Sequence, residues 1–224
     1  MSLHLTEKLA EDDIFSHLSP RDHEELTRLA FSKKYRKGQY ICMQDDIWKR
    51  ALYIKSGKLG WVMLSPDGKR QVVFRLGAGR VVWGHSIFDG EPMPAALEAM
   101  EDCEVCMWEG DAIIPILSRN VDAVWAITGK LVRTMRKVRD VVYGFAFHPV
   151  AGRLANLLLS HYKPVDGQAA PRDMTLDEMA HTVGSTRELV SKTLHQFASE
   201  GMIEISRVEI TFTDRNKLEE LINE

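Results

Sequence analysis

Two helix-start patterns lie ten residues apart in the stretch MTLDEMAHTVGSTRELVSKTLHQF, toward the C-terminal end of the chain. Thr175-x-x-Glu178 matches a capping box, in which two side chains satisfy free backbone N–H groups at a helix start. Ser185-x-x-Glu188 matches the same pattern. Gly184 stands directly before it, and glycine readily takes the left-handed conformation at which helices end. The spacing therefore predicts two short helices joined by a tight turn, a helix-turn-helix.

The second of these helices is expected to end near Gly201 and to have one apolar and one polar face. Val190, Leu194 and Phe197 recur at helical spacing and predict the buried face. The sequence MIEISRVEITFTD that follows predicts two short strands, which would form a wing beside the helices. The outward face of the second helix then consists of Arg187, Glu188, Ser191, Lys192 and His195.

A long apolar repeat predicts an extended helix in the middle of the chain. From Val124 to Phe145, apolar residues and one threonine recur at alternating spacings of four and three, as in a coiled coil. Lys130, Arg133, Arg136 and Lys137 lie off this repeat and predict a basic outer face. Such a helix either pairs with a second copy of the chain or packs on its own β domain; its length and regularity favour a parallel dimer. The expected dimer seam is Val124, Thr128, Leu131, Met135, Val138 and Val142, with Phe145 at its end.

Short β-rich runs separated by glycine turns occupy residues 33–109. The Asp67-Gly68 pair, between the runs Leu59–Leu64 and Gln71–Leu76, predicts a β-hairpin. Strands at this spacing without long helices between them indicate an antiparallel roll or jelly roll.

The chain is therefore predicted to be an α+β protein with three parts. These are an N-terminal β-roll (1–118), a dimerisation helix (119–147) that ends at His148-Pro149, and a C-terminal winged helix-turn-helix domain (148–224). An amphipathic helix and a polar loop containing Pro164, Asp166, Gly167 and Pro171 are expected at the start of the last part. This part has 8 Lys and Arg against 12 Asp and Glu, a net charge of −4. If this part binds DNA, it is expected to do so through a few placed cations rather than through a broadly basic surface.

These segments, in this order, resemble the Crp/Fnr family of transcription regulators. The stretch YIKSGKLGWVMLSPDGKRQVVFRLGAG resembles the family's sensor roll, YGFAFHPVAGRLANLLL its hinge, and the helix-turn-helix stretch its DNA-binding motif. The resemblance implies a homodimer that binds a palindromic operator in double-stranded DNA, acts with RNA polymerase as an activator and responds to a small effector or a redox signal in its N-terminal roll. It also implies that the DNA-binding residues are Ser185, Thr186, Arg187, Glu188, Ser191 and Lys192.

The chemistry of these side chains agrees with base reading. Arginine and lysine donate to O6 and N7 of guanine, and glutamate accepts from N4 of cytosine. Adjacent Arg187 and Glu188 could thus read both strands of neighbouring G·C pairs. The alternative for Glu188 is a purely structural role as the capping partner of Ser185.

The effector site differs from that of the family's cyclic-nucleotide members. Those proteins hold ribose and phosphate with a Gly-Glu-Leu turn and a later Arg-Ser/Thr-Ala segment, whereas this chain has Gly84-His85-Ser86 and Met93-Pro94-Ala95. Cyclic AMP is therefore not expected to bind, and the sequence does not identify a cofactor. A haem ligated by His85, and a vestigial pocket in a constitutively active dimer, stay open as alternatives. The candidate effector residues are Trp83, Gly84, His85, Ser86 and Met93, with Arg139 on the long helix.

Other functional classes have little support in the sequence. The odd number of cysteines (Cys42, Cys103 and Cys106) argues against a disulfide framework. Cys103 and Cys106 are expected on one strand, where residues three apart face opposite sides and suit a shared metal ion poorly. No catalytic constellation, membrane span or signal peptide is recognised, so a non-enzymatic, cytoplasmic protein is expected. A ligand-binding module whose helix-turn-helix contacts another protein is the remaining rival.

Overall fold

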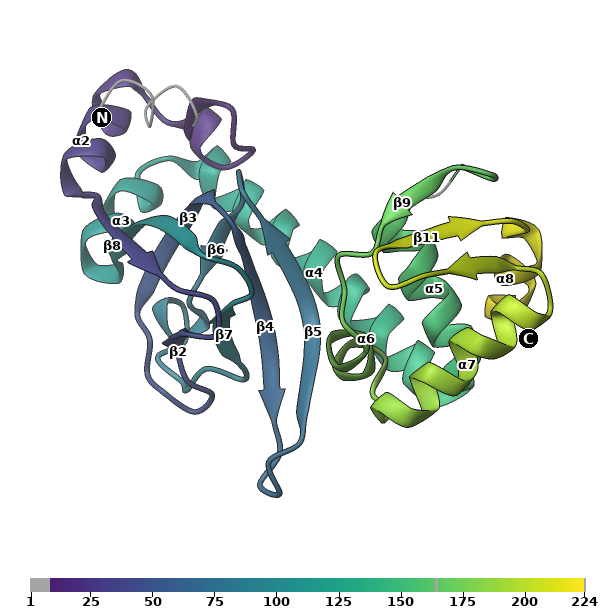
Figure 1. Cartoon of the computed structure of the whole chain (residues 1–224). Helices are drawn as coiled ribbons and strands as arrows, with labels where there is room; N and C mark the ends of the chain where they lie inside the picture. Colours follow the sequence, from purple (N-terminus) through teal and green to yellow (C-terminus); the bar gives the residue numbers. More distant parts are fainter. Residues whose placement is uncertain (1–8, 164, 224) are drawn as a thin grey trace. The chain divides into compact units, whose positions relative to one another are not determined.

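The computed structural model describes residues 9–163 and 165–223, so the predicted positions of Pro164 and of the N-terminal octapeptide lie outside the described residues. The chain divides into two compact units, Met1–Arg136 and Lys137–Glu224. The division falls within the long helix α4 (Val121–Phe147), which contributes residues to both units (Figure 1). The predicted limits at 118 and 148 lie on either side of this helix.

The first unit contains an antiparallel β-roll, as the turn spacing predicted. One sheet has the strand order β1-β8-β3-β6 and another has the order β2-β7-β4-β5. The expected hairpin around Asp67-Gly68 is confirmed, since β4 and β5 pair along their length and form the long ribbon of Figure 1. The strands are β1 (Phe31–Tyr35), β2 (Tyr40–Cys42), β3 (Arg50–Ser56), β4 (Lys58–Leu64), β5 (Arg70–Gly77), β6 (Val81–Trp83), β7 (Ala96–Ala99) and β8 (Cys103–Glu109).

Strand β8 separates two apolar cores because alternate side chains of a strand face opposite sides. Cys103, Val105 and Met107 point into the interior of the roll, whereas Cys106 and Trp108 join an outer core under the helices. The prediction that Cys103 and Cys106 face opposite sides is thus confirmed. The cysteines are free and buried, and burial raises the pKa of each thiol, that of Cys42 to about 11.

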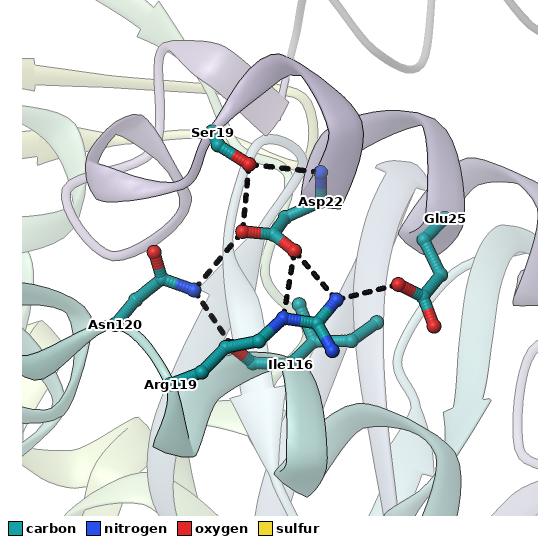
Figure 2. Close-up of polar contacts among 6 residues, drawn as sticks. All are labelled: Ser19, Asp22, Glu25, Ile116, Arg119 and Asn120. Carbon is teal, nitrogen blue, oxygen red and sulfur yellow. Dashed lines mark hydrogen bonds and ion pairs between the residues drawn. The ribbon is translucent and has the colours of Figure 1, made fainter.

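Helices cover the outer core of the first unit. They are α2 (Pro20–Leu29), α3 (Gly110–Ser118) and the first part of α4, with the 3-10 turns η1 (Phe15–His17) and η2 (His85–Ile87). The Asp22 carboxylate lies between Ser19 at the start of α2 and the Arg119-Asn120 link that joins α3 to α4 (Figure 2). Burial alone raises the pKa of Asp22, but hydrogen bonds from Arg119, Ser19 and Asn120 outweigh it and lower the pKa to about 2. This carboxylate therefore fastens α2 to the start of the long helix.

The second unit is a winged helix-turn-helix. Its elements are α5 (Val150–Tyr162), β9 (Ala169–Pro171), α6 (Leu176–Val183), α7 (Arg187–Ser199), β10 (Ile203–Ile205), β11 (Glu209–Phe212) and α8 (Arg215–Asn223). The predicted wing strands are confirmed as β10 and β11. Residues 169–171 were expected in a polar loop but form β9, because their backbone pairs with β11. Helix α8 was not predicted from the sequence; its Leu218 is fully buried in the core of this unit.

Candidate nucleic-acid interface and associated sites

Helix α6 begins and ends as the sequence predicted. The Thr175 hydroxyl accepts from the Glu178 N–H at 3.1 Å, and the Glu178 carboxylate accepts from the Thr175 N–H at 2.8 Å. Gly184 follows the helix in the left-handed conformation, with φ of 62°. This glycine lets the chain turn directly into α7, because a residue with a Cβ would be strained there.

The cap of α7 differs from the prediction by one residue. Thr186, not Ser185, is the capping residue, and its hydroxyl accepts from the Leu189 N–H at 3.3 Å. Glu188 is then the second residue of the helix, where it cannot close a capping box. The predicted Ser185–Glu188 box is therefore wrong, because the turn after Gly184 uses one more residue before the helix starts. Capping no longer accounts for Glu188.

The two faces of α7 are those expected from its spacing. Val190, Leu194 and Phe197 are buried in the core of the second unit, which fixes the rotation of the helix. The opposite face presents polar and charged side chains at the N-terminal end of the helix. Arg187, Glu188, Lys192 and His195 are exposed, and Ser191 is half-buried.

Arg187 contacts a carboxylate of the preceding helix. Its Nη1 lies 3.3 Å from Oδ2 of Asp177, and both side chains are more than half exposed. The pair lines a cleft of about 380 Å³ between the start of α6 and the wing. Arg172 and Arg207 also line this cleft. The sequence analysis missed these residues, although an arginine at the turn of a predicted wing was a usable signal.

The apolar repeat of α4 is exposed rather than buried on the roll. Side-chain exposure is 42% at Val124, 39% at Leu131 and 72% at Met135, and the repeat continues with 41% at Val138 and 59% at Val142. Ala123 and Ile127, outside the repeat, are the buried residues of this helix within the described chain. Within the first unit, packing on the β-roll therefore does not account for the seam residues Val124, Leu131 and Met135.

One member of the expected basic face lies elsewhere. The Lys130 ammonium donates to the Val81 carbonyl at 3.1 Å, so this side chain faces the roll. Burial lowers the pKa of Lys130. Arg133, Arg136 and Lys137 are exposed, as expected.

The effector turn Gly84-His85-Ser86 is packed tightly against Trp48. A Cβ on Gly84 would lie 2.2 Å from the Trp48 carbonyl oxygen, so only glycine fits. The Ser86 hydroxyl accepts from the Trp48 N–H at 3.1 Å and donates to the Glu91 carbonyl at 2.6 Å. This hydroxyl is fully engaged within the protein.

His85 is half-buried beside the Trp61 ring, with the two ring centroids 5.3 Å apart. Burial lowers the pKa of His85, which keeps the imidazole neutral. Among the described residues neither His85 Nδ1 nor the Trp48 indole N–H has a hydrogen-bond partner. The polar groups of this turn are therefore neutral.

The remaining candidate effector residues are not gathered at this turn. Met93 is buried in the interior core of the roll, but Trp83 points the other way, into the outer core beside Phe15. Side chains alternate along β6, so Trp83 faces the outer core with Val81, whereas Val82 faces the interior. Arg139 belongs to the second unit and pairs with the neighbouring Asp140.

Residues 9–163 and 165–223 contain neither a metal-binding cluster nor a membrane-spanning helix. No group of three His, Cys, Asp or Glu residues in that part could hold a metal ion. No helix there is long and apolar enough to span a membrane.

The two units match two family models. Residues 32–120 match the cyclic nucleotide-binding domain, and residues 152–221 match the Crp-like helix-turn-helix domain. The chain is thus a DNA-binding transcription regulator of the Crp-like class. It belongs to the Crp/Fnr family, as its sequence and fold together show.

Known relatives agree along nearly the whole chain. A CRP-like cAMP-activated global transcriptional regulator of Mycobacterium tuberculosis is 25% identical over 219 residues, covering 96% of this chain and 98% of that protein. Among solved structures, a crp/fnr-family transcriptional regulator from Eubacterium rectale superposes with a TM-score of 0.79 at 20% identity, covering 95% and 99%. The c-di-GMP responsive regulator CLP of Xanthomonas campestris gives 0.76 at 17% identity, covering 87% and 99%.

Proposed function

We propose that the protein is a homodimeric regulator that reads a roughly palindromic operator with the N-terminal turns of α7. The observation that carries this proposal is the exposed charged face of α7, which the buried Val190, Leu194 and Phe197 hold outward. Side chains in the first turns of a recognition helix meet base edges in the major groove. Arg187 and Lys192 would donate to guanine, and Glu188 would accept from cytosine.

The remaining DNA-binding residues have supporting roles in this proposal. Ser185, Thr186 and Ser191 carry hydroxyl groups near the start of α7 and would contact the DNA backbone there. The Thr186 hydroxyl accepts a hydrogen bond in the cap, but its proton remains available to a phosphate oxygen.

The seam of α4 supports a dimer. An exposed apolar stripe at coiled-coil spacing can be removed from water by packing against the same stripe of a second copy. A two-fold axis along the seam would place two recognition helices on the two half-sites of a palindrome. In this proposal residues 1–118 sense a signal, 119–147 hold the dimer, and 148–224 bind DNA and act with RNA polymerase.

The signal is proposed to be a molecule other than cyclic AMP. A cyclic nucleotide brings a phosphate anion, which a buried site must pair with a cation. The turn offers neutral His85 and a Ser86 hydroxyl that already makes two hydrogen bonds within the protein. The corresponding Met93-Pro94-Ala95 segment has no arginine. The donor set therefore suits a neutral effector.

Selection of operators from random DNA tests the proposal. The expected product is a palindromic consensus with G·C pairs at equivalent positions of each half-site, bound by two chains in sedimentation. Binding with no common sequence would refute base reading by α7. Native mass spectrometry of the purified protein is expected to show a small molecule or the unliganded dimer. A haem in that spectrum would instead support the gas-sensing alternative.

A further inference from the structure

Three arginines of the described second unit line the cleft between α6, α7 and the wing. Arg172 follows β9, Arg187 begins α7, and Arg207 lies in the turn between β10 and β11. Residues 148–224 contain only 8 Lys and Arg against 12 Asp and Glu. Asp173 and Asp177 also line the cleft, so its charged lining is three arginines against two carboxylates. Its net charge is positive whereas that of residues 148–224 is negative, which marks a site for an anion.

Arg172 is held in place by two hydrogen bonds and has a buried donor, Nε, that is unused within the described residues. Its Nη1 donates to the Ser206 carbonyl at 3.1 Å, and its backbone N–H donates to the Val208 carbonyl at 2.7 Å. Its Nε is buried and has no hydrogen-bond partner within the described residues. A buried N–H without an acceptor is costly, which points to an acceptor supplied from outside the chain. Arg207 is exposed on the wing turn and can reach an anion from that side.

Arg187 is in a different situation because Asp177 engages it. The contact at 3.3 Å uses Nη1 and leaves Nε and Nη2, two parallel donors of the kind that a guanine edge takes. The Asp177 carboxylate also lines the cleft, so it would draw the guanidinium of Arg187 toward itself and away from a neighbouring anion.

We propose that this cleft seats one backbone phosphate of the bound DNA, with Arg172 and Arg207 as its ligands, and that Asp177 keeps Arg187 available for a base. Asp177 is then a positioning residue for base reading. The inference rests on the proposed base-reading role of Arg187. Arg172 and Arg207 would then contribute to binding of every DNA sequence, whereas Arg187 would distinguish between sequences.

Arg207→Ala tests the phosphate seat without disturbing the hydrogen bonds of Arg172. Affinity for the operator and for an unrelated duplex is expected to fall by the same factor, with base preference unchanged. The slope of log affinity against log salt should become shallower by about one per subunit. Arg215→Ala is the matched control, since it removes an exposed cation of α8 that does not line the cleft. An unchanged salt slope in Arg207→Ala would overturn the seat.

Asp177→Asn tests the positioning role. Freed from the carboxylate, Arg187 can bind backbone phosphate, so affinity for unrelated DNA is expected to rise about two- to fivefold, the scale of an exposed ion pair. Operator affinity should rise less, and preference at the position read by Arg187 should weaken. Asp177→Glu should restore that preference. In the Arg187→Ala background, Asp177→Asn should leave preference unaltered.

Two results separate the failure of this inference from failure of the proposed function. Equal gains on operator and unrelated DNA in Asp177→Asn would mean that Asp177 only repels phosphate, and the positioning role would be wrong. If the unsubstituted protein itself selects no common sequence, the proposed function fails and the variants have no preference to change.

Discussion

Each unit has a turn with polar side chains at its candidate site. In the first unit these side chains face the protein, and in the second they face solvent. At the turn of the roll, Gly84 lies against Trp48, and the Ser86 hydroxyl makes two hydrogen bonds within the protein. At the turn of the helix-turn-helix, Gly184 leads into a helix whose Arg187 and Glu188 are exposed. Both units match their family models. The difference shows that a family fold can keep its packing in both units while the polar side chains of one turn face the protein and those of the other face solvent.

Disruption of the α4 seam is expected to have the largest effect. The seam is proposed to hold the dimer, and the dimer would present two copies of α7 to the DNA. Replacing Leu131 and Val138 with glutamate places like charges along the seam. Sedimentation is expected to report monomer, and operator affinity should fall by more than about tenfold because each half-site is then bound alone.

The control for the seam is the charge reversal Arg136→Glu with Lys137→Glu, which alters exposed residues off the repeat. These changes should leave the dimer intact. A dimer that survives both glutamates in the seam would show that the chains associate elsewhere.

Arg187→Ala is expected to have the next largest effect, restricted to the second unit. Loss of a guanine contact should cost about 1–3 kcal/mol per half-site and relax preference at one position. Both subunits carry the substitution, so a palindrome reports it twice. Selection from random DNA provides the measurement. A uniform loss across all sequences would instead assign Arg187 to phosphate, and the contrast between the two turns would weaken.

Asp22→Asn tests whether the first unit is held together by buried polar contacts. Because the folded pKa of Asp22 is about 2, below its ordinary value of 3.8, ionised Asp22 stabilises the folded state by about 2 kcal/mol. This stabilisation is complete above about pH 4 and is lost as the pH falls through about 2.

Denaturant unfolding at several pH values measures the effect of Asp22→Asn. The substitution should lower the free energy of unfolding by about 2 kcal/mol at pH 7 and progressively less below pH 4. Asp13→Asn is the control, because Asp13 is 85% exposed and lies 3.9 Å from Arg133. An equal loss in both variants would mean that the hydrogen bonds and ion pair of Asp22 are not the cause.

A smaller effect distinguishes the two possible caps of α7. Thr186→Ala should destabilise the second unit by about 1 kcal/mol, since its hydroxyl satisfies the Leu189 N–H. Ser185→Ala should change stability little. Thermal unfolding followed by circular dichroism compares the two variants. The reverse order of effects would restore the capping box first expected from the sequence.

Addition of cyclic AMP is expected to have no effect. Calorimetric titration with cyclic AMP should show no saturable binding in the micromolar range, because no cation at the turn pairs with a phosphate. A tight isotherm would contradict the comparison, since the roll would then retain a phosphate site like the one proposed for the second unit.

Local patterns were enough to predict much of this protein. The capping box at Thr175, the turn at Gly184 and the inward face of Val190, Leu194 and Phe197 depend on residues close in sequence, and all are confirmed. The hairpin at Asp67-Gly68 and the opposite faces of Cys103 and Cys106 follow from the period of a strand. Such features need no knowledge of distant residues.

Other features depend on contacts between segments distant in the sequence, and only the tertiary structure decided them. Strand β9 exists because β11 pairs with it, and Arg172, Asp177 and Arg207 meet in one cleft from separate elements. Trp83 lies away from the expected effector site because its side chain packs in the outer core, under the helices that cover the roll. The cap moved from Ser185 to Thr186 because either hydroxyl can accept an N–H, so local chemistry allows both. The path of the chain between α6 and α7, which are both packed in the core, makes Thr186 the capping residue.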